Sequence, residues 1–168
     1  MKIVVTGLLI FAGAVLQATL FNYLDLGGVR PSLLLITTVF FGLHDGPVSG
    51  ALVGFICGLL EDSLSSGIMG VNALARTLLG FTMGSVRGRL FRDTLWYRTA
   101  VLFLASLLGE TMVFTIRYVL EIEIRDSSFS NLRNVIFLSA LYNTLLAPLL
   151  FFSFDKLLRK DWISQKRM

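Results

Sequence analysis

Residues 46–61 read Gly-Pro-Val-Ser-Gly-Ala-Leu-Val-Gly-Phe-Ile-Cys-Gly-Leu-Leu-Glu, an apolar stretch with glycine at every fourth position. On an α-helix, residues four apart share one face, so Gly46, Gly50, Gly54 and Gly58 would form a strip without side chains. In a lipid environment such a strip lets another helix backbone approach closely. The stretch therefore predicts a membrane helix that packs through its glycines.

A second glycine strip follows in the next apolar segment, where Gly80, Gly84 and Gly88 repeat the same spacing. Two neighbouring helices with strips of this kind are expected to lie at the centre of a helix bundle. Packing of the strips within one chain is the favoured interpretation. The pattern alone leaves open that a helix of a partner protein fills the groove instead.

The composition excludes a water-soluble domain. The 168-residue chain is 55% hydrophobic and 15% charged, with a mean hydropathy of +0.76, which is too apolar for a globular protein of this size. One cysteine, Cys57, excludes an intrachain disulfide. No spacing typical of a metal site, a cofactor site or a hydrolase stands out, so we expect no metal, no cofactor and no enzymatic activity.

The apolar segments predict an all-α integral membrane protein, a compact bundle of about six transmembrane helices in a single domain over residues 1–168. The first segment ends without a small-residue cleavage site, which favours a retained anchor over a signal peptide. The second and third are short, and a re-entrant pair that leaves four full spans is the alternative. The expected spans are 3–21, 32–44, 46–61, 68–86, 99–120 and 135–155.

The cations predict the orientation of the bundle. Arginines crowd the connection between the fourth and fifth spans, and more cations follow the sixth. Because cytoplasmic loops are enriched in Lys and Arg, both termini are expected in the cytoplasm. The basic loop is read either as a topology determinant alone or as a site for lipid headgroups or a cytoplasmic partner. Its residues are Arg87, Arg89, Arg92 and Arg98.

Four polar residues fall inside the predicted spans, namely Asn72, Arg76, Glu110 and Asn143. Charges are costly in a membrane and rarely occur unpaired. We therefore expect Arg76 and Glu110 to pair inside the bundle, with the two asparagines satisfying the remaining donors and acceptors. Such a layer either holds the helices in register or lines a polar cavity for a small ligand, and the sequence leaves both open.

Several local features together resemble one family. Arg30-Pro31 leads into the second span, Gly-Leu-Leu-Glu-Asp-Ser-Leu-Ser-Ser-Gly covers residues 58–67 with Gly70 shortly after, and Asn143 and Pro148 lie in the sixth span. With the basic run after the fourth span, this order is similar to the rod shape-determining protein MreD family over nearly the whole chain.

The resemblance implies a non-catalytic scaffold in the bacterial inner (cytoplasmic) membrane, which supports lateral peptidoglycan synthesis and the regulation of cell shape. The implied partners are an MreC-type single-span protein, the MreB filament, RodA and a class B penicillin-binding protein, with no nucleic acid. It also implies the fold of the substrate-binding components of energy-coupling-factor transporters. Arg30, Pro31, Glu61 and Asp62 would shape the outer face that meets MreC, although Glu61 is not typical of the family.

Two other functions remain open from the sequence. The polar layer and the implied fold fit a small-molecule, vitamin-like binding component of a membrane transporter. A membrane enzyme acting on a lipid headgroup is a third reading, in which Glu110, Arg76 and Asp62 lie near the outer surface. Serines 63, 65 and 66 follow Glu61 and Asp62, but they lack a histidine or lysine that could act as a base.

Overall fold

The computed structural model describes residues 2–20, 31–65, 68–90, 95–120 and 129–165. Every element in these ranges is an α-helix, and they contain no strand. The prediction of an all-helical protein is therefore confirmed. The helices are α1 (Lys2–Leu20), α2 (Leu33–Asp45), α3 (Pro47–Leu64), α4 (Val71–Ser85), α5 (Arg87–Leu90), α6 (Leu95–Val119) and α7 (Phe129–Gln165).

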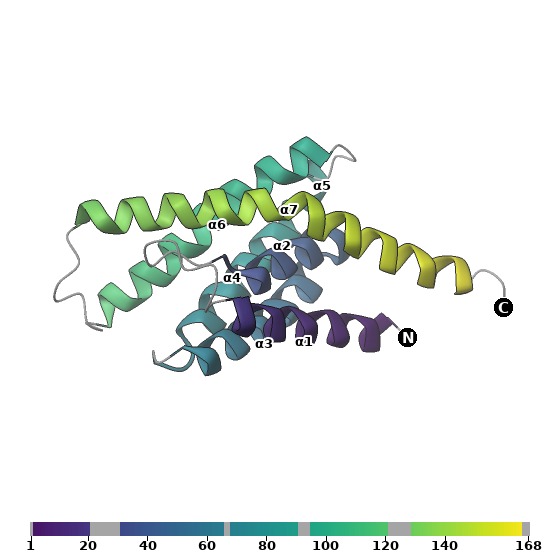
Figure 1. The fold of residues 1–168 in the computed structure, drawn as a ribbon, viewed down its shortest axis with the longest axis horizontal. Helices are drawn as coiled ribbons and strands as arrows, with labels where there is room; N and C mark the ends of the chain where they lie inside the picture. Colours follow the sequence, from purple (N-terminus) through teal and green to yellow (C-terminus); the bar gives the residue numbers. More distant parts are fainter. Residues whose placement is uncertain (1, 21–30, 66–67, 91–94, 121–128, 166–168) are drawn as a thin grey trace.

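The six long helices overlap the six predicted spans, and the short α5 is additional. Two boundaries are set by glycines with positive φ, a conformation that glycine adopts without strain: Gly46 (99°) separates α2 from α3, and Gly70 (104°) precedes α4. The largest difference is at α7, which continues ten residues beyond position 155 to Gln165. Pro148 lies inside α7, and the helix changes direction part-way along its length (Figure 1).

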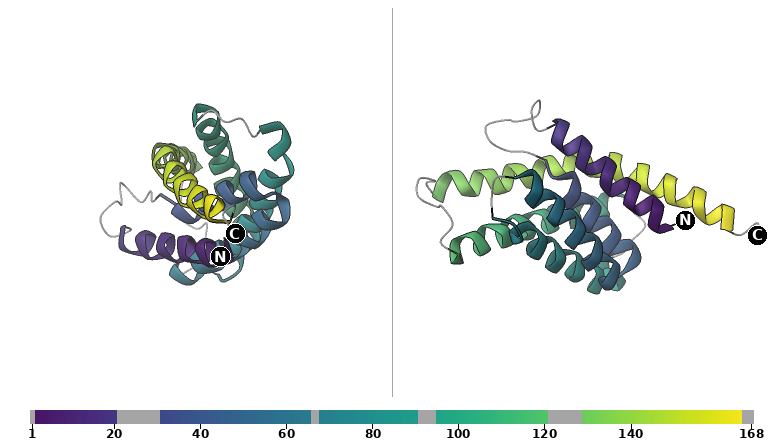
Figure 2. Two further views of the ribbon diagram at one scale, coloured as in Figure 1. Left: turned by 90° about the vertical axis from the view of Figure 1, so that its right-hand side faces the viewer. Right: turned by 90° about the horizontal axis from the view of Figure 1, so that it is seen from below.

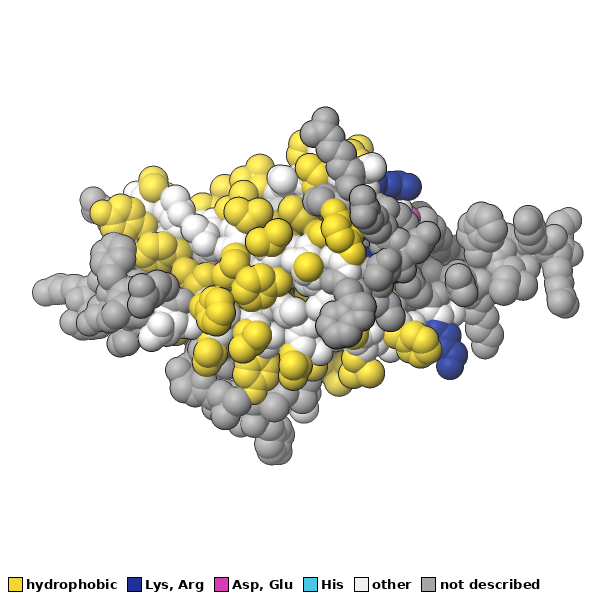
Figure 3. Space-filling model, turned by 90° about the horizontal axis from the view of Figure 1, so that it is seen from above, with side chains coloured by type: hydrophobic (Ala, Val, Ile, Leu, Met, Phe, Trp, Pro, Cys, Tyr) yellow, Lys and Arg dark blue, Asp and Glu magenta, His cyan; other side chains and the backbone are white. Residues whose placement is uncertain are grey.

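Among the described residues, three helices are long and apolar enough to cross a bilayer, at Pro47–Leu64, Tyr97–Val119 and Asn134–Phe154. Shorter apolar helices lie at Thr6–Thr19 and Leu33–Asp45. Large apolar side chains are exposed on their outer surfaces, for example Phe11 (67%), Leu52 (61%) and Leu145 (76%). Figure 3 shows apolar side chains across the middle of one face and described Lys and Arg side chains at one end of it. This distribution is that of a protein whose middle is surrounded by lipid.

The central helix is α2, and the expectation that the third and fourth spans are central is wrong. All residues from Leu33 to Leu43 are buried, and α2 contacts all the other long helices. Figures 1 and 2 show it enclosed, with α6 and α7 on one side and α1, α3 and α4 on the other. By contrast, α3 and α4 each bury one face and expose the other, because their glycines lie on one face only.

The two glycine strips pack against each other within the chain. A Cβ atom built at Gly50 would lie less than 3.0 Å from the Gly80 carbonyl, and one at Gly84 would meet the backbone of Pro47. A Cβ at Gly54 would meet the Arg76 carbonyl oxygen. Since only glycine tolerates these approaches, the strips fix the antiparallel register of α3 and α4.

The glycine contacts extend to both ends of the α3–α4 hairpin, except at Gly88. Gly58 packs on Ala73, where a Cβ would lie 2.5 Å from the Ala73 Cα atom. Gly46 forms the turn before α3. Gly88 has no atom within 4 Å of a built Cβ and takes no part. The α3–α4 packing begins at this turn and ends near the C-terminal end of α3.

Substituting Gly54 by alanine is expected to lower the free energy of unfolding by about 1–3 kcal/mol, because the new methyl group would displace the α4 backbone. Titration with SDS, followed by loss of the folded species, measures the change. Gly7→Ala is the matched control, since nothing lies within 4 Å of that position and alanine favours a helix. Equal stability of the two variants would contradict the packing described above.

Candidate functional site

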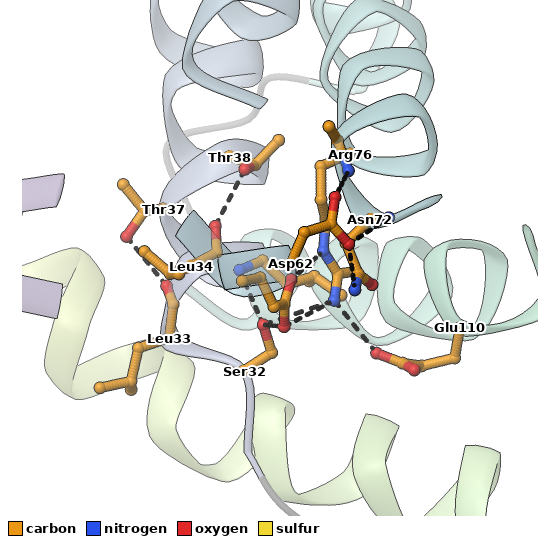
Figure 4. Close-up of polar contacts among 12 residues, drawn as sticks. Ser32, Leu33, Leu34, Thr37, Thr38, Asp62, Asn72, Arg76 and Glu110 are labelled. Carbon is orange, nitrogen blue, oxygen red and sulfur yellow. Dashed lines mark hydrogen bonds and ion pairs between the residues drawn. The ribbon is translucent and has the colours of Figure 1, made fainter. Parts of the chain in front are cut away.

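The polar side chains of the bundle gather around the end of α3, where two acids are adjacent in sequence. Asp62 is 2% exposed, and the Glu61 side chain is 14% exposed. Both therefore lie inside the bundle, and their partners differ; Figure 4 shows Asp62 beside Asn72. The acids meet the beginnings of two other helices.

Asp62 caps the N-terminus of α4. Its Oδ2 atom accepts hydrogen bonds from the backbone N–H groups of Gly70 (2.8 Å) and Ala73 (3.0 Å). Its Oδ1 atom accepts from the Asn72 backbone N–H (3.0 Å) and the Asn72 side-chain amide (2.9 Å). The first turn of a helix carries unpaired donors and a partial positive charge, so this carboxylate is stabilised without a cation.

Arg76 carries the only buried positive charge among the described residues, and it pairs chiefly with Glu61. Its Nε atom donates to Glu61 Oε2 (2.9 Å) and its Nη2 atom to Glu61 Oε1 (3.2 Å). This two-point contact matches the planar shapes of the two groups. Nη2 also lies 3.4 Å from Glu110 Oε1. The expected contact between Arg76 and Glu110 is therefore present, but it is longer than both bonds from Arg76 to Glu61. Asn72 donates to Asp62 rather than to this pair, and its expected role is wrong.

The beginning of α2 is held by side chains from other helices. Ser32 is its N-cap, since the Ser32 hydroxyl accepts from the Leu35 N–H (3.0 Å) and donates to Glu61 Oε1 (3.0 Å). Gln17 Oε1 on α1 accepts from the Leu34 N–H (3.1 Å). These bonds satisfy donors that would otherwise be buried without a partner.

Asn143 joins α7 to the same layer. Its Oδ1 atom accepts from the Ser32 N–H (2.8 Å), and its Nδ2 atom donates to the Ser106 hydroxyl on α6 (3.1 Å). The Asn143 side chain is completely buried. The expectation that it would complete the Arg76 pair is wrong, because it bonds instead to the start of α2.

The layer therefore connects all six long helices. Gln17 comes from α1, Ser32 from the start of α2, Glu61 and Asp62 from α3, Asn72 and Arg76 from α4, Ser106 and Glu110 from α6, and Asn143 from α7. Nearly all of its donors and acceptors bond to one another. Among the buried side-chain atoms of this layer, Arg76 Nη1 has no hydrogen-bond partner, and it lies against Gly109, where a Cβ would be 3.0 Å away.

Three members of the layer were not predicted from the sequence. Gln17 is an amide inside an apolar segment, and that anomaly could have identified it. Ser32 directly precedes an apolar run, which is the signal of a helix N-cap. Ser106 carries no sequence signal that distinguishes it from the other hydroxyl residues of α6.

The residues expected at an outer face are placed differently. Glu61 and Asp62 turn inward, and Pro31 is buried. Arg30 lies outside the described residues. Direct contact of the Asp62 carboxylate with a partner would require the bundle to open, because Asp62 is 2% exposed.

The basic loop is only partly described. Arg87 is exposed at the start of α5, and Arg98 is partly buried in α6. The Arg89 side chain and Arg92 lie outside the described residues. Among the residues that the structure does describe, no group of three or more His, Cys, Asp or Glu side chains could hold a metal ion.

Comparison with known proteins identifies the family. The family model described as rod shape-determining protein MreD matches residues 1–161. The chain belongs to the MreD family. Membership gives it a role in rod shape determination, and the resemblance seen in the sequence is confirmed. No curated protein and no solved structure matches the chain. In this MreD-family chain, the acid that follows Gly-Leu-Leu-Glu is the cap of α4.

Proposed function

We propose that this chain is a non-catalytic scaffold of the rod complex in the bacterial inner membrane, supporting lateral peptidoglycan synthesis. The observation that carries the proposal is the polar layer that joins all six long helices and pairs its buried side-chain polar atoms with one another, except for Arg76 Nη1. A layer of this kind fixes the relative positions of the helices and offers no nucleophile paired with a base. A rigid bundle with an apolar exterior suits a protein whose task is to hold partners.

We also propose six crossings with both termini in the cytoplasm. The described ends of the chain, Lys2 and Gln165, lie at the same end of the bundle (Figure 1), which supports an even number of crossings. Arg87 and Arg98 follow α4 and begin α6, and α5 lies towards that end. Positive charge marks the cytoplasmic side. The likeness to the fold of energy-coupling-factor substrate-binding components is part of the same proposal.

The proposed partners are an MreC-type single-span protein on the outer side and MreB on the cytoplasmic side, together with RodA and a class B penicillin-binding protein. Purification of the tagged full-length chain from its membranes tests this, with the MreC-type protein expected at a constant ratio. The Gly54→Ala variant should recover less of it than the matched Gly7→Ala variant, because only the first disturbs the bundle. Recovery of an ATPase coupling module instead would overturn the proposal.

The second candidate is a vitamin-like ligand-binding component of a transporter, and one observation favours it. Arg76 Nη1 is buried without a hydrogen-bond partner, as an atom that awaits a ligand would be. Against this, Gly109 lies directly beside it, since a Cβ built at Gly109 would be 3.0 Å from Nη1, and the other buried side-chain polar atoms of the layer are paired. Mass spectrometry of the denatured, purified protein distinguishes the two: a stoichiometric small molecule supports the transporter function, and its absence supports the scaffold.

A further inference from the structure

Among the described residues, the three acids of the polar layer accept different numbers of hydrogen bonds. Asp62 accepts four, of 2.8–3.0 Å. Glu61 also accepts four, two from Arg76 and two from uncharged side chains at 3.0 and 3.5 Å. Glu110 accepts one, of 3.4 Å, from Arg76 Nη2 (Figure 4). Because hydrogen bonds to a carboxylate favour its charged form, Glu110 is the acid whose charge is least stabilised.

The bond to Glu110 comes from a donor that is shared. Arg76 Nη2 carries two hydrogens, but three acceptors lie within hydrogen-bond distance of it: Glu61 Oε1 (3.2 Å), Glu110 Oε1 (3.4 Å) and the Ser32 hydroxyl (3.5 Å). Arg76 Nη1 has no partner, so it adds no second bond to Glu110. The described residues supply no donor to Glu110 Oε2. One oxygen of this carboxyl group is therefore free to hold a hydrogen.

The acids of the layer also outnumber the groups that balance their charge. Asp62 is balanced by the N-terminal end of α4. Arg76 makes its two-point contact with Glu61, so Glu110 is left over. The next cation on α6 is Arg117, about 10 Å further along the helix at ~1.5 Å per residue. Arg117 lies in the last turn of α6, where the helix end itself attracts positive charge.

Glu110 lies at a depth where an unbalanced charge is costly. The apolar span of α6 ends at Val119, which is about 14 Å beyond Glu110 at ~1.5 Å per residue. Since the hydrocarbon core is about 30 Å thick, Glu110 falls near its middle. Its side chain is 25% exposed, and at that depth the bundle is surrounded by acyl chains. An acid in such surroundings becomes neutral by taking up a proton.

We infer that Glu110 carries a proton in the folded protein, held on Oε2. Oε1 is then the carbonyl oxygen of a carboxylic acid and still accepts the hydrogen bond from Arg76. Each remaining charge of the layer has a partner in this state. The inference rests on the proposed crossing of the bilayer by α6, and it does not depend on the proposed protein partners.

The charged groups around Glu110 agree with a bound proton. Among the described residues, Arg76 from α4, Glu61 from α3 and Arg117 from α6 itself act on it. The other long helices contribute to the layer only side chains that do not titrate, namely Gln17 of α1, Ser32 before α2 and Asn143 of α7. The two cations favour the ionised acid, and Glu61 opposes it. Because Arg76 is already paired with Glu61, the proton takes the place of a second cation.

A matched pair of amide variants tests which acid holds the proton. Glu110→Gln replaces a neutral acid by a neutral amide of the same shape, so the unfolding midpoint in SDS should stay at the wild-type value at neutral pH. Glu61→Gln removes a charge that Arg76 neutralises, and it should lower the midpoint. A loss in Glu110→Gln as large as that in Glu61→Gln would show that ionised Glu110 holds the bundle, and it would overturn the inference.

The bound proton also makes the stability depend on pH. In the unfolded chain the carboxyl group reaches water and is ionised at neutral pH. The folded protein then binds one proton more than the unfolded chain, so its stability falls as the pH rises. Between about pH 6 and about pH 9, the midpoint of the wild type should fall more steeply than that of Glu110→Gln. Other titrating groups, such as His44, are present in both proteins, so parallel slopes would overturn the inference.

Infrared spectroscopy of the full-length protein in lipid vesicles detects the proton directly. The carbonyl stretch of a protonated carboxyl group is separate from the bands of carboxylates and of amide groups. The wild type should show this band at neutral pH, and Glu110→Gln should lack it. A wild-type spectrum without the band would overturn the inference.

The crossing by α6 is checked separately with the single variants Arg87→Cys and Leu120→Cys in sealed vesicles. Arg87 precedes α6, Leu120 follows it, and both are exposed. The native Cys57 is completely buried and should not react. Labelling of the two variants from opposite sides supports the crossing on which the inference depends. Labelling of both from one side would overturn the crossing and the inference together, while the co-purification result would stand unaffected.

Discussion

The Arg76→Ala variant is expected to lose about 3–5 kcal/mol of unfolding free energy, because it leaves two acids inside the bundle without their cation. Glu61 would lose a two-point contact and Glu110 its one hydrogen bond to Arg76. In practice little folded protein should be recovered from membranes. Size-exclusion chromatography of the solubilised protein and SDS titration of the folded fraction measure the effect.

The control for Arg76 is Arg87→Ala, which removes the same side chain from an exposed position in α5 and should keep the wild-type yield. Arg76→Lys should give an intermediate result, since lysine keeps the charge but cannot make the planar two-point contact. A folded and stable Arg76→Ala protein would mean that the acids are neutral or solvated, and the ion pair would then not hold the bundle.

Double-mutant cycles separate the two acids. The coupling of Arg76 to Glu61 should exceed its coupling to Glu110, because the first contact has two bonds of 2.9 and 3.2 Å and the second has one of 3.4 Å. The Glu110 side chain is also more exposed, 25% against 14%. Strict additivity for both pairs would contradict the arrangement of the layer.

The helices of this fold could be predicted from the apolar segments of the sequence. The central position of α2 could not be predicted from the glycine strips of α3 and α4. Glycine spacing reports how closely two backbones approach, and it correctly paired the segments that became α3 and α4. It does not report burial on the other face. The signal for the centre was the sequence of α2, which lacks a charged residue from Leu33 to Leu43 and whose two threonines bond to carbonyls of their own helix, since a helix that is apolar all round is surrounded by other helices or lipid.

The sequence predicted how deep the polar side chains lie in the bundle, but it did not predict which of them bond to one another. Position along each span placed Arg76 and Glu110 at a similar depth, and the two are in contact. Glu61 was assigned to the membrane exit of α3, although the turn and the antiparallel return of α4 bring it to Arg76, 15 residues away. Which way a side chain points across a glycine interface depends on the packed structure, and depth alone does not determine it.

The acid at position 62 serves the fold. In this chain it follows the glycine-containing helix α3, and it caps the next helix. The cap links α3 to α4 at the end of the hairpin where the chain connects the two helices, while the glycines link them along its length. Both devices act on the same pair of helices, so damage to either should loosen the same interface.

Asp62→Ala is expected to lower the free energy of unfolding by about 3 kcal/mol, because it removes a helix cap and leaves several buried donors without acceptors. The Asn72 amide and the N–H groups of Gly70 and Ala73 lose their acceptors. SDS titration gives the stability, and hydrogen exchange of the first turn of α4 should become faster. Ser63→Ala is the control, since Ser63 is exposed and bonds only to the carbonyl of Leu59 among the contacts described.

Asp62→Asn separates the cap from a role in partner binding. Asparagine keeps one acceptor oxygen and removes the charge at the positive end of α4, so a loss between those of Ser63→Ala and Asp62→Ala is expected. If Asp62 acts only through the fold, recovery of the MreC-type protein should fall in proportion to the folded fraction in all three variants. Full folding of Asp62→Asn with loss of that protein would show that the carboxylate contacts the partner, and that the outer end of α3 opens when the complex forms.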